Sequence, residues 1–224
     1  MNNDSSYIQN LIQFLSSHLS AERLERIHYA LNNRTRYMTL VLENMFQEHN
    51  ASAVVRTAEC FGVQDIHTIE NLRVFKPTST IAMGASKWLS FYQHTTTLNA
   101  YEALRQKGYY IVATSPSPQS YTPSTLPLNQ PVALVFGTEG IGLSSDALAH
   151  ADAFLYIPMY GLTQSFNVSV SAALCVSKII ERMREQALYW QLNEREYEQL
   201  LLEWLRAAVS GSAELEKRLL SMQL

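Results

Sequence analysis

The sequence has few charged residues and only two cysteines. Charged residues make up 17% of the 224 positions, the formal net charge is −3, and the cysteines are Cys60 and Cys175. Two thiols that do not form a C-x-x-C pair cannot build a zinc site alone, and both lie in apolar helical contexts. We therefore expect two reduced core cysteines in a cytosolic protein. A weakly acidic chain argues mildly against a nucleic-acid partner but leaves room for a local basic patch.

Several other signals are missing as well. The sequence contains no run of 18 apolar residues, and its Asn- and Ser-rich start lacks a basic segment followed by an apolar one, so we expect no membrane span and no signal peptide. It lacks G-x-S-x-G, H-E-x-x-H and a Walker A sequence, which leaves hydrolase, metalloenzyme and P-loop functions without support. We expect no metal. The hydrophobic content of 47% is sufficient for a large core.

Hydrophobic periodicity predicts an α/β protein with helices added at both ends. We divide the chain into an N-terminal helical extension (1–36), a main domain (37–186) and a C-terminal helical extension (187–224). The β-loop-α-β order at the start of the main domain is typical of a right-handed parallel crossover. The predicted strands are 37–42, 65–70, 88–94, 109–114, 131–136 and 154–158. The predicted helices are 6–31 in two pieces, 51–61, 98–107, 144–150, 165–186, and two between 193 and 222.

One stretch, residues 157–170, passes from a strand end through a glycine loop into a long helix. Ser165 is a natural N-cap there, with Asn167 in the first turn. Free backbone N–H groups at such a helix start suit a ligand, although the same pattern also fits an ordinary connection. The glycines of 137–142 follow the most apolar strand in the order G-x-x-G-x-G, and they enclose Glu139, whose charge is hard to explain in a plain tight turn.

A third stretch contains a helix that we expect Asn50 to cap. Arg56 lies within this helix among apolar residues, where an arginine either extends to water or faces an anion. His49, just before the helix, is a weak candidate for a general base. Arginines also gather near the N-terminal extension, where they form either a solvated helix face or a phosphate-binding surface (Arg23, Arg26, Arg34 and Arg36).

In series, these three stretches resemble the motifs of the SpoU/TrmH branch of the SPOUT methyltransferases. Asn50 to Ala58 is similar to N-x-x-A-x-x-R-T, and Val135 to Leu143 is similar to G-x-E-x-x-G-(I/L/V). The stretch 157–170 matches the family pattern I-P-M-x-G-x-x-x-S-x-N-V-S-V-A almost throughout. The resemblance covers about residues 37–185 and is specific because order, spacing and context all agree.

The resemblance implies a parallel α/β sheet with a deep C-terminal trefoil knot, which local patterns cannot show. The knot loops of this family hold S-adenosylmethionine, and family members are homodimers joined through the last knot helix. Carried over residue by residue, the resemblance implies a cofactor pocket built from Thr114, Gly137, Ile157, Leu162, Ser165 and Phe166.

The reaction implied by the resemblance is methyl transfer to a ribose 2′-hydroxyl. In the family, the residue matching Arg56 is assigned as the base. Arginine scarcely deprotonates in proteins, so Arg56 is either an unusual base or a clamp on phosphate and the developing alkoxide. Asn50 would orient Arg56 or the ribose. The remaining motif residues would hold the site and cofactor loops (Glu139, Ser165 and Asn167).

The short extensions are most similar to those of family members that methylate a D-loop guanosine of tRNA, and we expect tRNA or another structured RNA as partner, with no DNA. The alternatives are another tRNA position, rRNA, or a catalytically silent RNA-binding relative. Gln47-Glu48 stands where the family often has Lys-Pro, which is expected to weaken or redirect RNA binding. The C-terminal helices either bind RNA or pack the dimer, and their many glutamates favour packing.

Overall fold

The computed structural model describes residues 2–45, 47–70, 84–115, 120–186 and 189–222. The chain divides into two compact units. One consists of residues 35–190, and the other combines residues 1–34 with 191–224. The predicted division into 1–36, 37–186 and 187–224 has slightly different bounds and stays a prediction.

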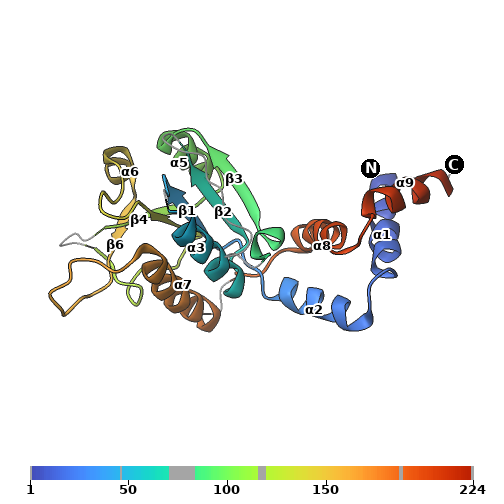
Figure 1. The fold of residues 1–224 in the computed structure, drawn as a ribbon, viewed down its shortest axis with the longest axis horizontal. Helices are drawn as coiled ribbons and strands as arrows, with labels where there is room; N and C mark the ends of the chain where they lie inside the picture. The colour runs from blue at the N-terminus through green and yellow to red at the C-terminus, as the bar shows by residue number, and fades with distance from the viewer. Residues whose placement is uncertain (1, 46, 71–83, 116–119, 187–188, 223–224) are drawn as a thin grey trace. The chain divides into compact units, whose positions relative to one another are not determined.

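The larger unit is built on a six-stranded sheet in the order β3-β2-β1-β5-β4-β6, and every pairing in it is parallel. Parallel strands need crossover connections, which here carry the helices (Figure 1). The central strand pair, β1 and β5, is completely buried, as expected for apolar runs covered on both faces. The strands are β1 (Met38–Glu43), β2 (Asp65–Ile69), β3 (Ser90–His94), β4 (Tyr110–Thr114), β5 (Val132–Phe136) and β6 (Ala153–Leu155).

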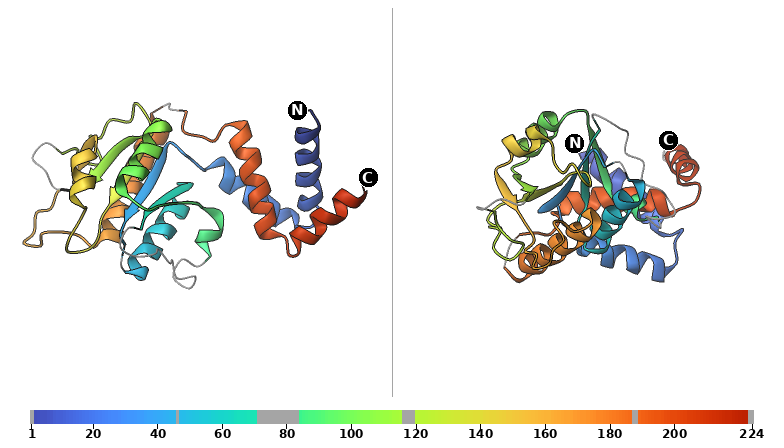
Figure 2. Two further views of the ribbon diagram at one scale, coloured as in Figure 1. Left: turned by 90° about the horizontal axis from the view of Figure 1, so that it is seen from above. Right: turned by 60° about the vertical axis from the view of Figure 1, so that its left-hand side comes forward.

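Helices cover both faces of this sheet (Figures 1 and 2). Along β5, Val132, Leu134 and Phe136 share one hydrophobic core with α3 and α7, whereas Ala133 and Val135 share another with α5 and α6. This alternation follows from the two-residue period of a strand. The covering helices are α3 (Glu48–Cys60), the short 3-10 helix η1 (Ala85–Trp88), α5 (Thr97–Gln106), α6 (Ser145–His150) and α7 (Val168–Glu185).

Two predicted helix starts are wrong. α3 begins at Glu48 with Gln47 as its N-cap, so Asn50 lies inside the first turn. The amide of Asn50 donates to other side chains and does not cap the helix. α7 begins at Val168, and its N-cap is Asn167, whose side-chain oxygen accepts a hydrogen bond from the Ser169 N–H at 2.9 Å. Ser165 therefore lies three positions before the first helical residue and is not the cap.

The predicted strands exist, with shifted ends. The strand expected over 154–158 is β6 and stops at Leu155, while the one expected over 88–94 begins at Ser90 after the 3-10 helix. Glu43, predicted as loop, is the last residue of β1 and is only 1% exposed. Part of the connection predicted over 71–87 lies outside the described residues.

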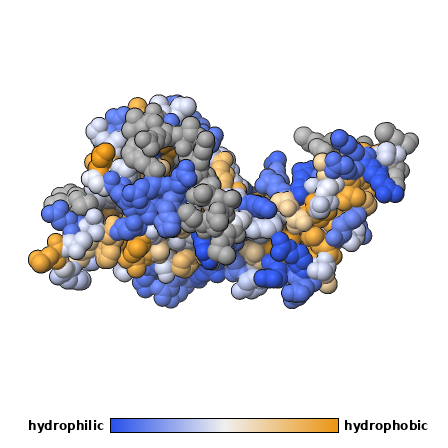
Figure 3. All heavy atoms as spheres, in the orientation of Figure 1, coloured by the Kyte–Doolittle hydropathy of each residue, from blue (hydrophilic) through white to orange (hydrophobic). Residues whose placement is uncertain are grey.

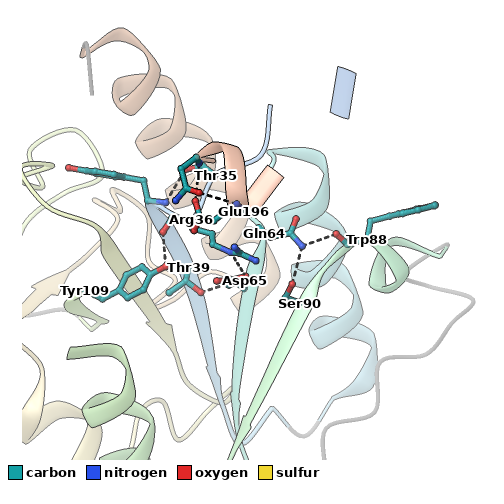
Figure 4. A network of polar contacts seen from close by, with 11 residues as sticks. Thr35, Arg36, Thr39, Gln64, Asp65, Trp88, Ser90, Tyr109 and Glu196 are labelled. Carbon is teal, nitrogen blue, oxygen red and sulfur yellow. Dashed lines mark hydrogen bonds and ion pairs between the residues drawn. The ribbon is translucent and has the colours of Figure 1, made fainter. Parts of the chain in front are cut away.

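The edge of the sheet where β1 and β2 begin is held by polar contacts (Figure 4). Arg36 Nε lies 3.3 Å from a carboxylate oxygen of Asp65, and the Thr39 hydroxyl donates to the Asp65 carbonyl at 2.7 Å. The Tyr109 hydroxyl donates to the Arg36 carbonyl at 2.6 Å. Arg36 thus has partners within its own chain and is not part of a free phosphate-binding surface.

In its described residues, the smaller unit contains four helices that pack against one another. The Arg34 guanidinium lies 4.9 Å from the ring centre of Trp204, and the side chain is 2% exposed, so it too belongs to the interior. Nδ1 of His28 and the Tyr197 hydroxyl are 2.7 Å apart. The apolar face predicted for the first C-terminal helix is thus covered within this unit, whereas Leu215 and Leu219 of the second are only partly buried. Its helices are α1 (Asn2–Ser16), α2 (Ala21–Asn32), α8 (Glu194–Ala208) and α9 (Ser212–Met222).

The two cysteines are free thiols in different surroundings. Cys175 is buried in α7, and burial raises the pKa of its thiol to about 12. Cys60, at the end of α3, is exposed, so the prediction of a core position is wrong for this residue. None of the helices in the described part of the chain has the length and apolar character needed to span a membrane.

Candidate functional site

A cavity of about 590 Å³ lies at the carboxyl ends of β4, β5 and β6 and beside the start of α7. This is the edge where parallel α/β sheets bind ligands. Its wall includes Thr114 at the end of β4, the loop from Gly137 to Leu143, and parts of the segment between β6 and α7. The volume is within the range typical of small-molecule sites.

Four of the five other residues predicted to bind a cofactor line this cavity together with Thr114: Gly137, Ile157, Ser165 and Phe166. Leu162 does not line the cavity and is fully exposed in the same segment. The hydroxyl of Thr114 donates to the Val135 carbonyl at 2.7 Å, which ties the ends of β4 and β5 together. The cavity is thus formed by the predicted loops, and Leu162 remains only a proposed contact.

The glycine loop approaches itself closely at Gly137. A Cβ at this position would lie less than 3.0 Å from backbone atoms of Gly142 and Leu143. Thr138 and Gly142 exchange two backbone hydrogen bonds, at 3.0 and 2.9 Å, which close the loop into a tight bridge. Glycine is therefore required at 137 by space, and the loop presents its backbone to the cavity.

Three predicted motif residues meet in one hydrogen-bond network. Glu139 Oε1 accepts from Asn50 Nδ2 at 2.6 Å and from Asn167 Nδ2 at 2.7 Å. Asn167 Nδ2 also lies 3.2 Å from Asn50 Oδ1. Asn50 is 5% exposed and donates a second bond to Gln47 Oε1 at 2.8 Å. Residues from α3, the glycine loop and the start of α7 are thereby joined at the rim of the cavity.

A second, smaller cavity of about 60 Å³ adjoins this network. Thr138, Glu139 and Val168 line both cavities. The remaining residues of the smaller wall are Met45, Gln47 and Asn50. The hydrogen-bond network therefore lies between the larger and the smaller cavity.

Arg56 lies apart from both cavities. Its side chain is exposed on α3, and no hydrogen bond or ion pair joins it to the described residues. His49 is also exposed and lines neither cavity. Of the five residues predicted as catalytic, Asn50, Glu139 and Asn167 contact one another, Ser165 lines the larger cavity, and Arg56 stands alone.

Glu43 is an important residue that the sequence reasoning missed. Its buried carboxylate accepts bonds from the Ser144 N–H at 2.8 Å, the Ser144 hydroxyl at 2.7 Å and the Thr97 hydroxyl at 2.6 Å. Ser144 follows the glycine loop directly and caps α6. Glu43 thus fixes the far end of the loop that lines the cavity. A charged residue directly after an apolar strand was the available signal.

Several apolar side chains in the segments that form the cavity, and on α7, are exposed. Ile141, Tyr160 and Leu162 are more than four-fifths exposed, and Val170 and Leu174 are nearly half exposed on α7. Hydrophobic surface is visible at the left-hand end of Figure 3, toward which the segment before α7 extends in Figure 1. Such a grouping is typical of a surface that contacts a partner. Among the described residues, no group of three or more His, Cys, Asp or Glu side chains is placed to hold a metal ion.

Comparison with known proteins gives a matching family model and a similar relative of the same kind. Residues 37–177 match the model of the SpoU rRNA Methylase family. A Borreliella burgdorferi protein named tRNA (guanosine(18)-2'-O)-methyltransferase is 39% identical over 200 residues, which are 89% of this chain and 92% of that protein.

Solved structures agree with these sequence likenesses. The A. aeolicus TrmH/SpoU tRNA modifying enzyme superposes with a TM-score of 0.76 at 29% identity, covering 84% of this chain and 97% of the other. The SpoU methyltransferase AviRb from Streptomyces viridochromogenes, in complex with the cofactor AdoMet, shares the fold with a TM-score of 0.59 at 20% identity, covering 71% of this chain and 62% of the other. The predicted fold, a parallel sheet with a C-terminal trefoil knot, is confirmed.

Proposed function

This chain belongs to the SpoU rRNA Methylase family, and from that premise we propose that it is an S-adenosylmethionine-dependent tRNA (guanosine(18)-2'-O)-methyltransferase. The observation that carries the proposal is the extent of the likeness to the Borreliella burgdorferi relative of that name, which spans 200 residues, 89% of this chain and 92% of that protein. A tRNA substrate also makes the cytoplasm the proposed site of action.

The larger cavity fits the proposed methyl donor. It combines apolar side chains such as Ile157 and Phe166 with the backbone of the glycine loop and the polar side chains of Thr114 and Ser165. An adenine ring needs apolar walls with hydrogen-bonding groups at its edge, and both are present. S-adenosylmethionine supplies an electrophilic methyl group on a sulfonium, so the protein needs only to position and activate the accepting hydroxyl.

We assign the protein's part of the reaction to residues at the rim. Asn50, Glu139 and Asn167 hold the glycine loop and the start of α7 in one arrangement through their mutual hydrogen bonds. Ser165 contributes to the wall against the donor. Arg56, a permanent cation without a partner among the described residues, is suited to bind an RNA phosphate and to stabilise the developing alkoxide.

We further propose that the protein is a homodimer joined through α7. The outward face of this helix exposes Val170 and Leu174 at 45% and 44%, and burial of such a face in an interface is favourable. We propose that in such a dimer Arg56 of one copy acts at the site of the other, since it lines neither cavity of its own chain.

The direct test is methyl transfer from labelled S-adenosylmethionine to unmodified tRNA transcripts, followed by nucleoside analysis. The expected product is 2′-O-methylguanosine in the D-loop. Cofactor binding without transfer to tRNA would move the substrate to rRNA or to another RNA, and absence of cofactor binding would favour a silent relative.

A variant tests the role of the arginine. We expect Arg56→Ala to lower the transfer rate by about 10²–10³, as the loss of one transition-state donor does. Binding of S-adenosylmethionine should survive because Arg56 lines neither cavity. Arg56→Lys keeps the charge and should retain part of the rate if the role is electrostatic. Full turnover in Arg56→Ala would refute the assignment.

A further inference from the structure

Two cations of the larger unit have no partner among the described residues. The structure describes eight arginine and lysine side chains within residues 35–190, and six of them contact another group. Arg56 and Lys87 are the exceptions, since both are exposed and neither has a hydrogen bond, ion pair or ring contact with a described residue. The six partnered cations are Arg36 with Asp65, Arg105 with Asp152, Lys178 with Glu181, Arg182 with the Pro123 carbonyl, Arg184 with the Trp190 ring and Lys107 with the Tyr92 ring.

The two unpartnered cations lie on neighbouring elements that cover the same face of the sheet. Lys87 belongs to η1, which packs against α3, the helix of Arg56. Ala85 and Leu89, on either side of Lys87, share one hydrophobic core with Ala58 of α3. An RNA strand carries one negative charge per nucleotide, so two cations on one surface suit two of its phosphates. On the basis of the function proposed above, we propose that Lys87 binds a phosphate of the RNA that Arg56 contacts.

This assignment leaves the role of Arg56 unchanged and holds in a dimer. η1 and α3 are parts of the same compact unit of one chain. Lys87 therefore accompanies Arg56 to whichever copy's site the arginine serves. Arg56 acts at the reacting ribose, whereas Lys87 is a positioning residue that binds the RNA at a distance from it.

The backbone around Lys87 is anchored, so the cation is presented from a fixed point. The Lys87 N–H donates to the Gly84 carbonyl at 3.1 Å. The next carbonyl, of Trp88, accepts from Gln64 Nε2 at 3.1 Å, and the same amide donates to the Ser90 hydroxyl at 3.2 Å (Figure 4). Only the lysine side chain remains to be ordered when a phosphate binds, which lowers the entropic cost of the contact.

The start of α3 explains why a cation on another element is useful. Gln47 and Glu48 stand where the family often has Lys-Pro, so this chain lacks a positive charge there. Glu48 is exposed in the first turn of α3, where its carboxylate repels phosphate. Lys87 supplies a positive charge from η1 in place of the missing one.

The salt dependence of tRNA binding tests the proposal. Each phosphate contact adds about 0.7–0.9 to the slope of log affinity against log salt concentration. The dissociation constant for an unmodified tRNA transcript is measured for the full-length wild type and Lys87→Ala from about 50 to about 200 mM salt. We expect a smaller slope for Lys87→Ala, so that the wild type loses about 3-fold more affinity over this range. Lys87→Arg should keep the slope of the wild type.

Lys107→Ala is the matched control. It removes the same charge, but Lys107 follows α5, which covers the other face of the sheet, and its ammonium lies 4.2 Å from the Tyr92 ring centre. Its salt slope should equal that of the wild type. An equal loss of slope in Lys107→Ala and Lys87→Ala would overturn the proposal, because net charge alone would then explain the effect.

Steady-state kinetics separate positioning from catalysis. Lys87→Ala should raise KM for tRNA in proportion to the dissociation constant and leave kcat at saturating tRNA unchanged, whereas Arg56→Ala lowers kcat. The affinity for S-adenosylmethionine should stay that of the wild type, because Lys87 lines neither cavity. Sedimentation should give the same oligomeric state for Lys87→Ala as for the wild type.

The outcomes distinguish this proposal from the function on which it rests. If the wild type methylates no RNA, the proposed function fails. If the wild type methylates tRNA while Lys87→Ala keeps its tRNA affinity and salt slope, the assignment of Lys87 alone is overturned. A changed oligomeric state in Lys87→Ala would also overturn it, because Lys87 would then belong to the contact between copies.

Discussion

Replacement of Gly137 by alanine is the sharpest test of how the glycine loop shapes the cavity. The added Cβ would lie within 3.0 Å of backbone atoms of Gly142 and Leu143, where ordinary contacts are 3.4–4 Å. Backbone atoms cannot rotate away as a flexible side chain can. The bridge between Thr138 and Gly142 must therefore shift or open. Both residues line the cavity, so its shape should change as well.

The size of the effect follows from the cost of overpacking. Insertion of one carbon into a tightly packed site costs about 1–3 kcal/mol. If the loop relieves this strain by moving into the cavity, the same energy is lost from ligand binding, which corresponds to about 5- to 150-fold weaker affinity for S-adenosylmethionine. If the loop holds its place, the cost appears as lower stability of the folded chain.

Titration calorimetry with S-adenosylmethionine and urea unfolding together measure both possibilities. Gly161→Ala is the matched control, because a Cβ there meets no atom within 4 Å and the residue has no left-handed backbone angle. It should change neither affinity nor stability. The reasoning is refuted if Gly137→Ala binds the cofactor as tightly as Gly161→Ala and unfolds at the same urea concentration.

Two further predictions concern buried titratable groups. Glu43→Gln should lower the free energy of unfolding by about 1.5–3 kcal/mol, since hydrogen bonds to a charged acceptor are replaced by weaker or opposed ones, and a urea-unfolding loss well below 1 kcal/mol would contradict the role assigned to Glu43. Burial, with smaller effects from His94 and Lys107, lowers the pKa of His67 to about 3. Because the unfolded side chain titrates near 6.5, the unfolded state binds the proton first as pH falls, and the stabilising effect of neutral His67 is complete above about pH 6.5 and is lost toward pH 3. Unfolding free energy measured between pH 6.5 and 5 should fall by up to about 1.4 kcal/mol per pH unit, and His67→Gln should reduce that slope.

Sequence patterns predicted the order of elements well because the central strands are apolar runs and most helices have one apolar face. They failed at the two helix starts that belong to the site. Asn50 and Ser165 both look like caps when only neighbouring residues are considered. In the structure, the Asn50 amide is taken by Glu139, which is distant in sequence, and Asn167 caps α7 instead. The neighbouring residues alone do not reveal whether such a side chain caps its helix or bonds a residue distant in sequence.

The residues of the network were nevertheless predictable as a set, through the resemblance of the motifs to a family. Topology explains why residues so far apart in sequence can serve one site. β5 lies between β1 and β4, so the segments that follow β1 and β5 leave the same edge of the sheet side by side. α7 packs against α3, which brings Asn167 to Asn50. The single carboxylate oxygen shared by both amides makes the three segments interdependent. Loss of any one of these three side chains should therefore disturb the placement of the other two.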